Sequence, residues 1–425
     1  MSDYVLKGNI CFSVDKEKID TVDGYLVCID NKCAGVFEKL PKKFKDLELI
    51  DYGNNLIIPG MVDLHIHASQ YAYRGLGYDY ELLEWLDKMA FKEENKFADV
   101  DYAKKAYKIF VDEVKKSATT RLSIFASRHV EATIELMKQL EKSGLVSYVG
   151  KVNMDRNAPS PLVETNSYED TREWLDKTVG KYKNTKPIIT PRFIPSCSDE
   201  LLYDLGKLLL MYDVPVQSHL SENLSEIEYV KELCPNSKFY GDAYNEYGLF
   251  GKKNNKSYKT LMAHCVYSSN DEIKLMKEND AYIVHCPSSN MNVSSGMAPI
   301  RKYLDLDMNM GLGSDVAGGT SESMFSIITK TIEVSKMYWR CIDQKYKALN
   351  FNEAFYLATM GGGSFFGEVG TFKEGYEMDA IVLDDSILKT TIELSTLERL
   401  QRAVYLSLDL KGGIKHKYVR GRKLF

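Results

Sequence analysis

Two histidines separated by one residue end an apolar run, and their spacing suits a metal centre. The run covers residues 59–67 and closes with His65-Ile66-His67. Successive side chains of a β-strand point to opposite faces, so a strand here places His65 and His67 on the same face. Neutral imidazole binds zinc, and a catalytic zinc site usually draws ligands from several segments and leaves one position open. A His-x-His pair alone is weak evidence, so its meaning depends on the other histidines.

The remaining histidines concentrate at the predicted ends of other strands. The chain has only seven histidines, and His219, His264 and His285 each close a short apolar run. Asp315 closes a further run and offers a carboxylate. In a parallel barrel the carboxyl ends of the strands meet at one face, where the chemistry gathers. We therefore expect these side chains to converge on one metal, with a structural or supporting role for His285 rather than direct ligation.

An acid follows one of these histidines closely, in Ser218-His219-Leu220-Ser221-Glu222. A divalent zinc lowers the pKa of bound water toward neutrality and so presents a hydroxide nucleophile. A nearby carboxylic acid then protonates the electrophile and later the leaving group. We interpret Glu222 as that acid, Asp315 as the group that takes the proton from the water, and His264 as the group that holds the hydroxide. The alternative for Glu222 is a solvated acid that opens a helix over residues 222–231.

Composition narrows the class of protein. The 425 residues include 55 Lys and Arg against 60 Asp and Glu, which gives a formal charge of -5. This balance lacks the basic stripe that nucleic-acid binding requires, so a polynucleotide substrate is disfavoured. The first residues lack the basic and apolar regions of a signal peptide, and no apolar stretch is long enough to span a membrane. Eight scattered cysteines without a Cys-x-x-Cys pair predict reduced thiols, so we expect a cytoplasmic protein without membrane partners.

The arrangement of apolar runs predicts an α/β protein with two domains. Short strands and turns occupy residues 4–58 and return near the end of the chain, so both termini are expected to share a small β-sandwich domain over 1–58 and 369–425. Between them, residues 59–368 alternate short apolar strands with helical periodicity, which is typical of a (β/α)8 barrel of the TIM type. The predicted barrel strands are 61–67, 121–125, 148–153, 188–192, 216–219, 261–264, 282–285 and 308–315.

These motifs together resemble the amidohydrolase superfamily. Its mark is His-x-His on the first barrel strand, histidines on the fifth and sixth strands and an aspartate on the eighth, and the chain has a residue at each position. The resemblance spans nearly the whole chain and includes the β domain built from both termini. It implies that His65, His67, His219 and Asp315 bind one zinc ion per chain, with iron as an alternative, and that His264 lies beside the attacking water.

Within the superfamily, the likeness is strongest to members that deaminate guanine. The stretches that carry it are residues 65–79, Thr-Pro-Arg-Phe at 190–193, residues 218–223 and residues 313–319. The resemblance implies that Gln70, Arg192 and Phe193 contact the purine, because an amide and a guanidinium read a polar edge and an aromatic ring stacks on a base. It further implies hydrolysis of guanine to xanthine and ammonia in purine catabolism, by a homodimer.

Three alternative functions compete with the hydrolysis of guanine. Within the class, the amine of a pterin, a triazine, cytosine or an adenosine-like compound is the nearest rival substrate. A non-catalytic barrel used as a scaffold is disfavoured, because both the ligand set and Glu222 are present. A deaminase of the cytidine type is excluded, since its zinc signature needs His-x-Glu followed by Pro-Cys-x-x-Cys, and no Pro-Cys-x-x-Cys occurs in the sequence.

Overall fold

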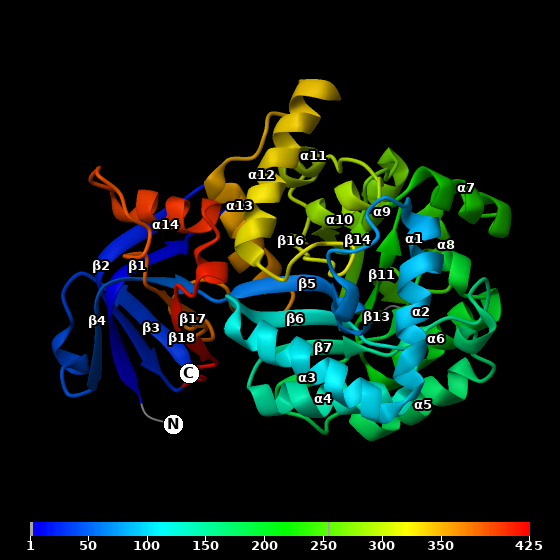
Figure 1. Cartoon of the computed structure of the whole chain (residues 1–425), viewed down its shortest axis with the longest axis horizontal. Helices are drawn as coiled ribbons and strands as arrows, with labels where there is room; N and C mark the ends of the chain where they lie inside the picture. Colours follow the sequence, from blue (N-terminus) through cyan, green and yellow to red (C-terminus); the bar gives the residue numbers. More distant parts are fainter. Residues whose placement is uncertain (1–2, 254–255) are drawn as a thin grey trace.

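The protein has a mixed α/β architecture with two visibly different regions. The computed structural model describes residues 3–253 and 256–425. At one end of the molecule, strands from the beginning and the end of the chain lie together (Figure 1). The rest of the chain forms parallel strands with helices packed around them (Figure 1). The predicted α/β class is confirmed.

The strands at the two ends of the chain form one seven-stranded sheet with the order β19-β18-β17-β4-β1-β2-β3. Their bounds are β1 Tyr4–Ser13, β2 Ile19–Ile29, β3 Lys32–Phe37, β4 Glu48–Pro59, β17 Ala380–Leu383, β18 Ile414–Val419 and β19 Arg422–Lys423. β1 pairs with β4 in parallel, and the other neighbours are antiparallel. The apolar runs on either side of polar residues 30–32 predict a hairpin, and it is confirmed: Asp30 and Asn31 join β2 to β3 with positive φ angles of 48° and 65°, as a tight hairpin turn requires.

The central strands are parallel and fall into connected groups. Their bounds are β5 Met61–His67, β6 Thr119–Phe125, β7 Val146–Gly150, β8 Val152–Asn153, β9 Thr185–Pro187, β10 Thr190–Pro191, β11 Val216–Leu220, β14 Thr260–His264, β15 Tyr282–His285 and β16 Met310–Leu312. The orders are β5-β6-β7-β9, β10-β8 and β11-β14-β15-β16. A parallel bridge joins Ile189 to Val216. The segment after β16 returns to β5 through a hydrogen bond from Asp315 N to His65 O, at 2.7 Å. A separate antiparallel pair consists of β12 Lys252–Lys253 and β13 Lys256–Ser257.

Helices follow most of the parallel strands. Their bounds are α1 Leu82–Trp85, α2 Phe91–Glu94, α3 Val100–Lys116, α4 Val130–Ser143, α5 Ser167–Thr178, α6 Asp199–Tyr212, α7 Leu224–Leu233, α8 Tyr240–Glu246, α9 Asn270–Glu278, α10 Pro287–Asn292, α11 Ile300–Asp305, α12 Met324–Cys341, α13 Phe351–Tyr356 and α14 Thr396–Tyr405. α4 shows why they form: Ile134, Met137 and Leu140 repeat at helical spacing and are buried. Gly144 then ends the helix in the left-handed conformation, at φ 83°.

The parallel strands differ from the sequence prediction where proline or a bend interrupts pairing. The run predicted over 148–153 divides into β7 and β8 at Lys151. Of the run predicted over 188–192, only Thr190–Pro191 pairs as a strand. Pro187 and Pro191 lack the N–H group that a ladder requires, which shortens regular pairing here. Among the described residues, no helix combines the length and the apolar character needed to cross a membrane.

Candidate metal centre and pocket

The predicted metal-binding histidines meet at the carboxyl ends of the parallel strands. His65 and His67 end β5, and His219 is the fourth residue of β11. The Nε2 atom of His67 lies 3.3 Å from Nε2 of His65 and 3.3 Å from Nε2 of His219. Asp315 Oδ1 lies 3.2 Å from Nε2 of His65 and 3.3 Å from Nε2 of His67. Four side chains from three separate segments of the chain therefore point their ligand atoms at one small volume.

Asp315 reaches this volume from a loop rather than from a strand end. β16 stops at Leu312, and Asp315 adopts a positive φ of 48° three residues later. Buried Asp63 fixes the preceding residue, since its carboxylate accepts hydrogen bonds from both Ser314 N and Ser314 Oγ. Gly313 is required because a Cβ there would lie only 2.8 Å from His65 Cβ. The prediction that a strand runs to Asp315 was wrong, although the carboxylate lies where that prediction put it.

The charges of the cluster suit a cation. Burial lowers the pKa of His65 to about 4, so this imidazole is neutral near pH 7. Desolvation and the neighbouring His65 and His67 rings likewise hold the pKa of His219 well below its ordinary value. Burial alone would raise the pKa of Asp315, but the adjacent histidines keep it well below the usual range. Neutral imidazoles beside an ionised carboxylate are the protonation states that metal ligands adopt.

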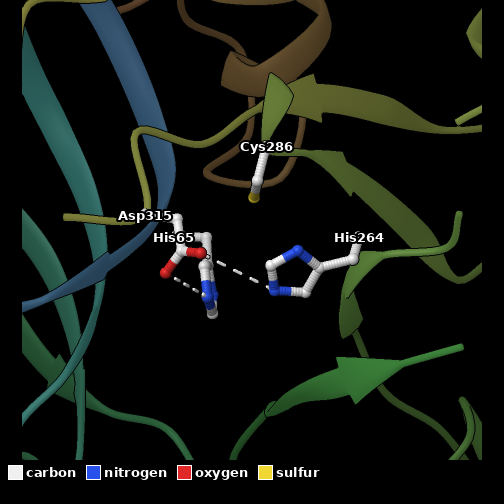
Figure 2. Close-up of side chains that lie close together, drawn as sticks. All are labelled: His65, His264, Cys286 and Asp315. Carbon is white, nitrogen blue, oxygen red and sulfur yellow. Dashed lines mark ion pairs between the residues drawn. The ribbon is translucent and has the colours of Figure 1, made fainter. Parts of the chain in front are cut away.

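The backbone also sets the orientation of one imidazole. His219 Nδ1 contacts the carbonyl oxygen of Arg192, which only accepts hydrogen bonds, so Nδ1 carries the proton. The lone pair of Nε2 then points toward His67 and the cluster. His264, at the end of β14, is a fourth histidine that faces the same volume, and its Nε2 lies 3.8 Å from Asp315 Oδ2. Figure 2 shows His264 facing Asp315 and His65, with the thiol of Cys286 directed toward the space between them.

Glu222 is a buried acid beside this cluster. It is 3% exposed, and its Oε2 lies 3.4 Å from His264 Nε2. Ser295 Oγ donates a hydrogen bond of 2.9 Å to the other carboxylate oxygen. Burial raises the pKa of Glu222 to about 7. The alternative of a solvated acid opening a helix is wrong, because α7 begins at Leu224 with Asn223 as its N-cap and Glu222 precedes both.

A pocket with about 440 Å³ of empty space, part of it open to solvent, joins the cluster to the residues predicted to read a base. Gln70 and Arg192 line it and are 1% and 2% exposed. Phe193 also lines it, from an extended backbone that follows β10. The apolar part of the lining comes from Leu82, Trp85, Leu86 and Val293. The lining of the pocket thus combines acidic and imidazole groups with an amide, a guanidinium and an aromatic ring, which is the mixture typical of a small-molecule site.

Several residues of the site were missed by sequence reasoning. Glu94 at the end of α2 accepts hydrogen bonds from both Gln70 and Arg192. Asn290 accepts from His264 Nδ1 at 2.8 Å as its amide is oriented. These contacts link segments far apart in the chain, so no local pattern indicates them.

His285 ends β15, as predicted, and is fully buried. Neither of its ring nitrogens has a hydrogen-bond partner within residues 3–253 and 256–425.

Comparison with known proteins gives a consistent result. The family model described as the amidohydrolase family matches residues 56–422. A guanine deaminase of Dictyostelium discoideum is 35% identical and covers 99% of this chain and 98% of its own length. The guanine deaminase of Homo sapiens is 36% identical, over 91% of this chain and 87% of its own. A crystal structure of guanine deaminase from C. acetobutylicum with bound guanine in the active site is 50% identical, with a TM-score of 0.95 over 100% of both chains. The chain belongs to the amidohydrolase family.

Proposed function

We propose that this chain hydrolyses guanine to xanthine and ammonia. The observation that carries the proposal is one pocket whose lining joins a cluster of metal-ligand type to Glu222 and to Gln70, Arg192 and Phe193. Independent support comes from relatives: several curated guanine deaminases are 33–37% identical over most of the chain. A structure 50% identical to this chain is described with guanine bound in its active site.

The proposed metal ligands are His65, His67, His219 and Asp315. Zinc bonds of about 2.0–2.1 Å would separate ligand atoms in neighbouring coordination positions by about 3 to 3.6 Å, and a fifth position would stay open for water. The distances of 3.2–3.3 Å between the ligand atoms fit this geometry. We infer one divalent ion per chain, zinc in the first instance and iron as the alternative, since imidazole and carboxylate suit both. When bound, such an ion acidifies water and polarises the reacting centre.

The proposed chemistry assigns the proton transfers to two carboxyl groups. Glu222, in its protonated form, donates its proton to N3, the ring nitrogen next to C2 that carries no hydrogen, as the water oxygen bonds to C2. Asp315 Oδ2, the oxygen nearer to His264, accepts the proton that the attacking water loses. His264 orients this water through Nε2. Glu222, now a carboxylate, takes the proton of the C2 hydroxyl and passes it to the exocyclic nitrogen, so that the C2–N bond breaks, ammonia leaves and the C2 oxygen becomes the carbonyl of xanthine. The proton held by Asp315 then restores the acid form of Glu222.

The remaining side chains are proposed to bind and orient the base. Arg192 donates to the carbonyl oxygen at C6, and the Gln70 amide contacts the polar edge beside it. Phe193 offers a ring face for stacking. Together these contacts aim C2 at the cluster. Correct orientation of this kind supplies a large share of the rate enhancement of an enzyme.

We further propose a finer architecture: a (β/α)8 barrel over 59–368 and a β-sandwich domain over 1–58 and 369–425. The barrel is supported by the parallel order of the strands and by the hydrogen bonds from Asp315 N to His65 O and from His67 N to Val316 O. The sandwich is supported by one apolar cluster that contains side chains of β2 and of β17. The two strands between them in the sheet, β4 and β1, contribute to the same cluster, so these four strands share a continuous apolar core.

We infer a cytoplasmic homodimer. All eight cysteines are free and six of them are buried, which suits a reducing compartment. The dimer is inferred from the family resemblance, and sedimentation of the purified protein tests it directly: a single species with the mass of one chain contradicts it.

An ammonia-release screen tests the activity. Purified enzyme is offered guanine, adenine, cytosine, a pterin and a triazine at equal concentration. We expect guanine to give the highest kcat/KM and xanthine to form in equal amount with ammonia. Preferred release from another of these amines, or no release from guanine, contradicts the proposal.

A further inference from the structure

A buried carboxylate connects the two polar side chains that line the base-reading end of the pocket. Glu94, the last residue of α2, is only 2% exposed. Its Oε1 accepts a hydrogen bond of 2.8 Å from Gln70 Nε2. Its Oε2 accepts a hydrogen bond from Arg192 Nη1. One side chain therefore contacts a residue that follows β5 and a residue that follows β10, neither of them its sequence neighbour.

This carboxylate fixes which way round the Gln70 amide lies. A carboxylate offers only acceptors, so Gln70 must present its NH₂ group to Glu94. The amide oxygen is then turned toward the backbone N–H of Ala317, at 3.4 Å. The two ends of an amide group are nearly equal in shape. Without Glu94, the Gln70 amide would therefore be free to present either its donor or its acceptor to the pocket.

The same helix holds Arg192 in two ways. Phe91 lies three residues before Glu94, and side chains three apart share one face of a helix. The guanidinium carbon of Arg192 lies 5.2 Å from the centre of the Phe91 ring, within the range of a cation–π contact. A buried guanidinium needs a counter-charge, and Glu94 is its ion-pair partner. Its other N–H groups remain available to a ligand in the pocket.

We propose that Glu94 is a positioning residue that sets the base specificity of this site by orienting Gln70 and Arg192 together. It does not touch the reacting atoms, so its effect reaches the substrate through those two side chains. The inference rests on the proposed function, because it takes the ligand to be a purine with an oxygen at C6. It predicts that Glu94 matters for a substrate with that oxygen and little for one without it.

The test compares guanine with 2-aminopurine, which carries the same amino group at C2 but has hydrogen at C6. Glu94→Gln keeps the shape but supplies one acceptor and one donor, so either Gln70 or Arg192 loses its partner. We expect kcat/KM for guanine to fall about 10- to 100-fold, mainly through KM, the size expected for a charged hydrogen bond. The value for 2-aminopurine changes less than about threefold. If 2-aminopurine is not turned over, its inhibition constant against guanine serves instead.

Glu93→Gln is the matched control. Glu93 is also buried on α2, but its carboxylate bonds to Tyr102 and Lys96 rather than to the pocket residues. We expect this variant to leave the ratio of guanine to 2-aminopurine unchanged. Glu94→Asp, which keeps the charge, should recover part of the ratio and also serves if Glu94→Gln does not fold. Equal losses for both substrates, or an unchanged ratio in Glu94→Gln and Glu94→Asp, overturn the inference. Wild-type enzyme that releases no ammonia from guanine instead overturns the proposed function.

Discussion

The two ends of the pocket are built in different ways. At the metal end, His65 and His67 end β5, and His219 and His264 lie at the ends of β11 and β14. These strands are hydrogen-bonded along their length to parallel neighbours. At the base-reading end, Gln70 and Arg192 lie just beyond strand ends and depend on Glu94 of the short helix α2. Strand ends hold the first group, whereas side-chain contacts between separate segments hold the second.

The difference suggests which part of the activity each end controls. Parallel strands fix several ligand atoms at once, so the ability to bind a cation belongs to the whole sheet. The base-reading end is held by few contacts, and loops of this kind carry specificity on a rigid scaffold. Changes at the metal end should therefore abolish catalysis, and changes at the base-reading end should alter the choice of substrate.

Removal of the metal gives the largest expected effect. Exhaustive dialysis against a chelator should abolish ammonia release from guanine, and about one equivalent of zinc per chain should restore it, because four ligand atoms define one site. Metal analysis by atomic absorption measures the ratio. A ratio of two per chain, or full activity of metal-free protein, contradicts the single catalytic centre.

Glu222→Gln should give the next largest loss. The substitution removes a proton donor outside the proposed ligand set, and general acid–base groups typically contribute about 10²- to 10⁴-fold to the rate. We expect kcat to fall by that factor with the metal content unchanged. Glu228→Gln, at an exposed position of α7, is the control and should behave like the wild type. Near-normal turnover by the Glu222 variant rules out the role.

Arg192→Ala tests the other end of the pocket. It removes the proposed donor to the C6 oxygen and leaves Glu94 without its ion-pair partner. We expect kcat/KM for guanine to fall about 10- to 100-fold, with metal content retained. Arg340→Ala, on the exposed end of α12, controls for loss of positive charge. Unchanged guanine kinetics, or loss of the metal together with activity, would remove the distinction between the two ends.

The same distinction explains what the sequence could predict. The His-x-His pair, Glu222 and most strand positions follow from local spacing, because a strand or a short loop fixes where such residues point. The terminal hairpin at Asp30 and Asn31 was predictable for the same reason. Glu94 was not, since its partners are 24 and 98 positions away and nothing in its own stretch differs from an ordinary helical acid. The loop conformation of Asp315 was also hidden, because it depends on buried Asp63.

The pH dependence gives the smallest effect and separates the two ends once more. Burial raises the pKa of Glu222 to about 7, so the fraction of protonated acid declines as the pH rises through that value. If the protonated form is the donor, kcat/KM should be level on the acidic side and fall about tenfold per pH unit on the alkaline side. Arg192→Ala should lower the whole curve without moving its midpoint, since Arg192 contacts Glu94 and not Glu222. Steady-state rates between about pH 6 and about pH 8.5 measure both curves. A rate that climbs through this range means that the working form of Glu222 is the carboxylate, and the assignment of the donor must then be reversed.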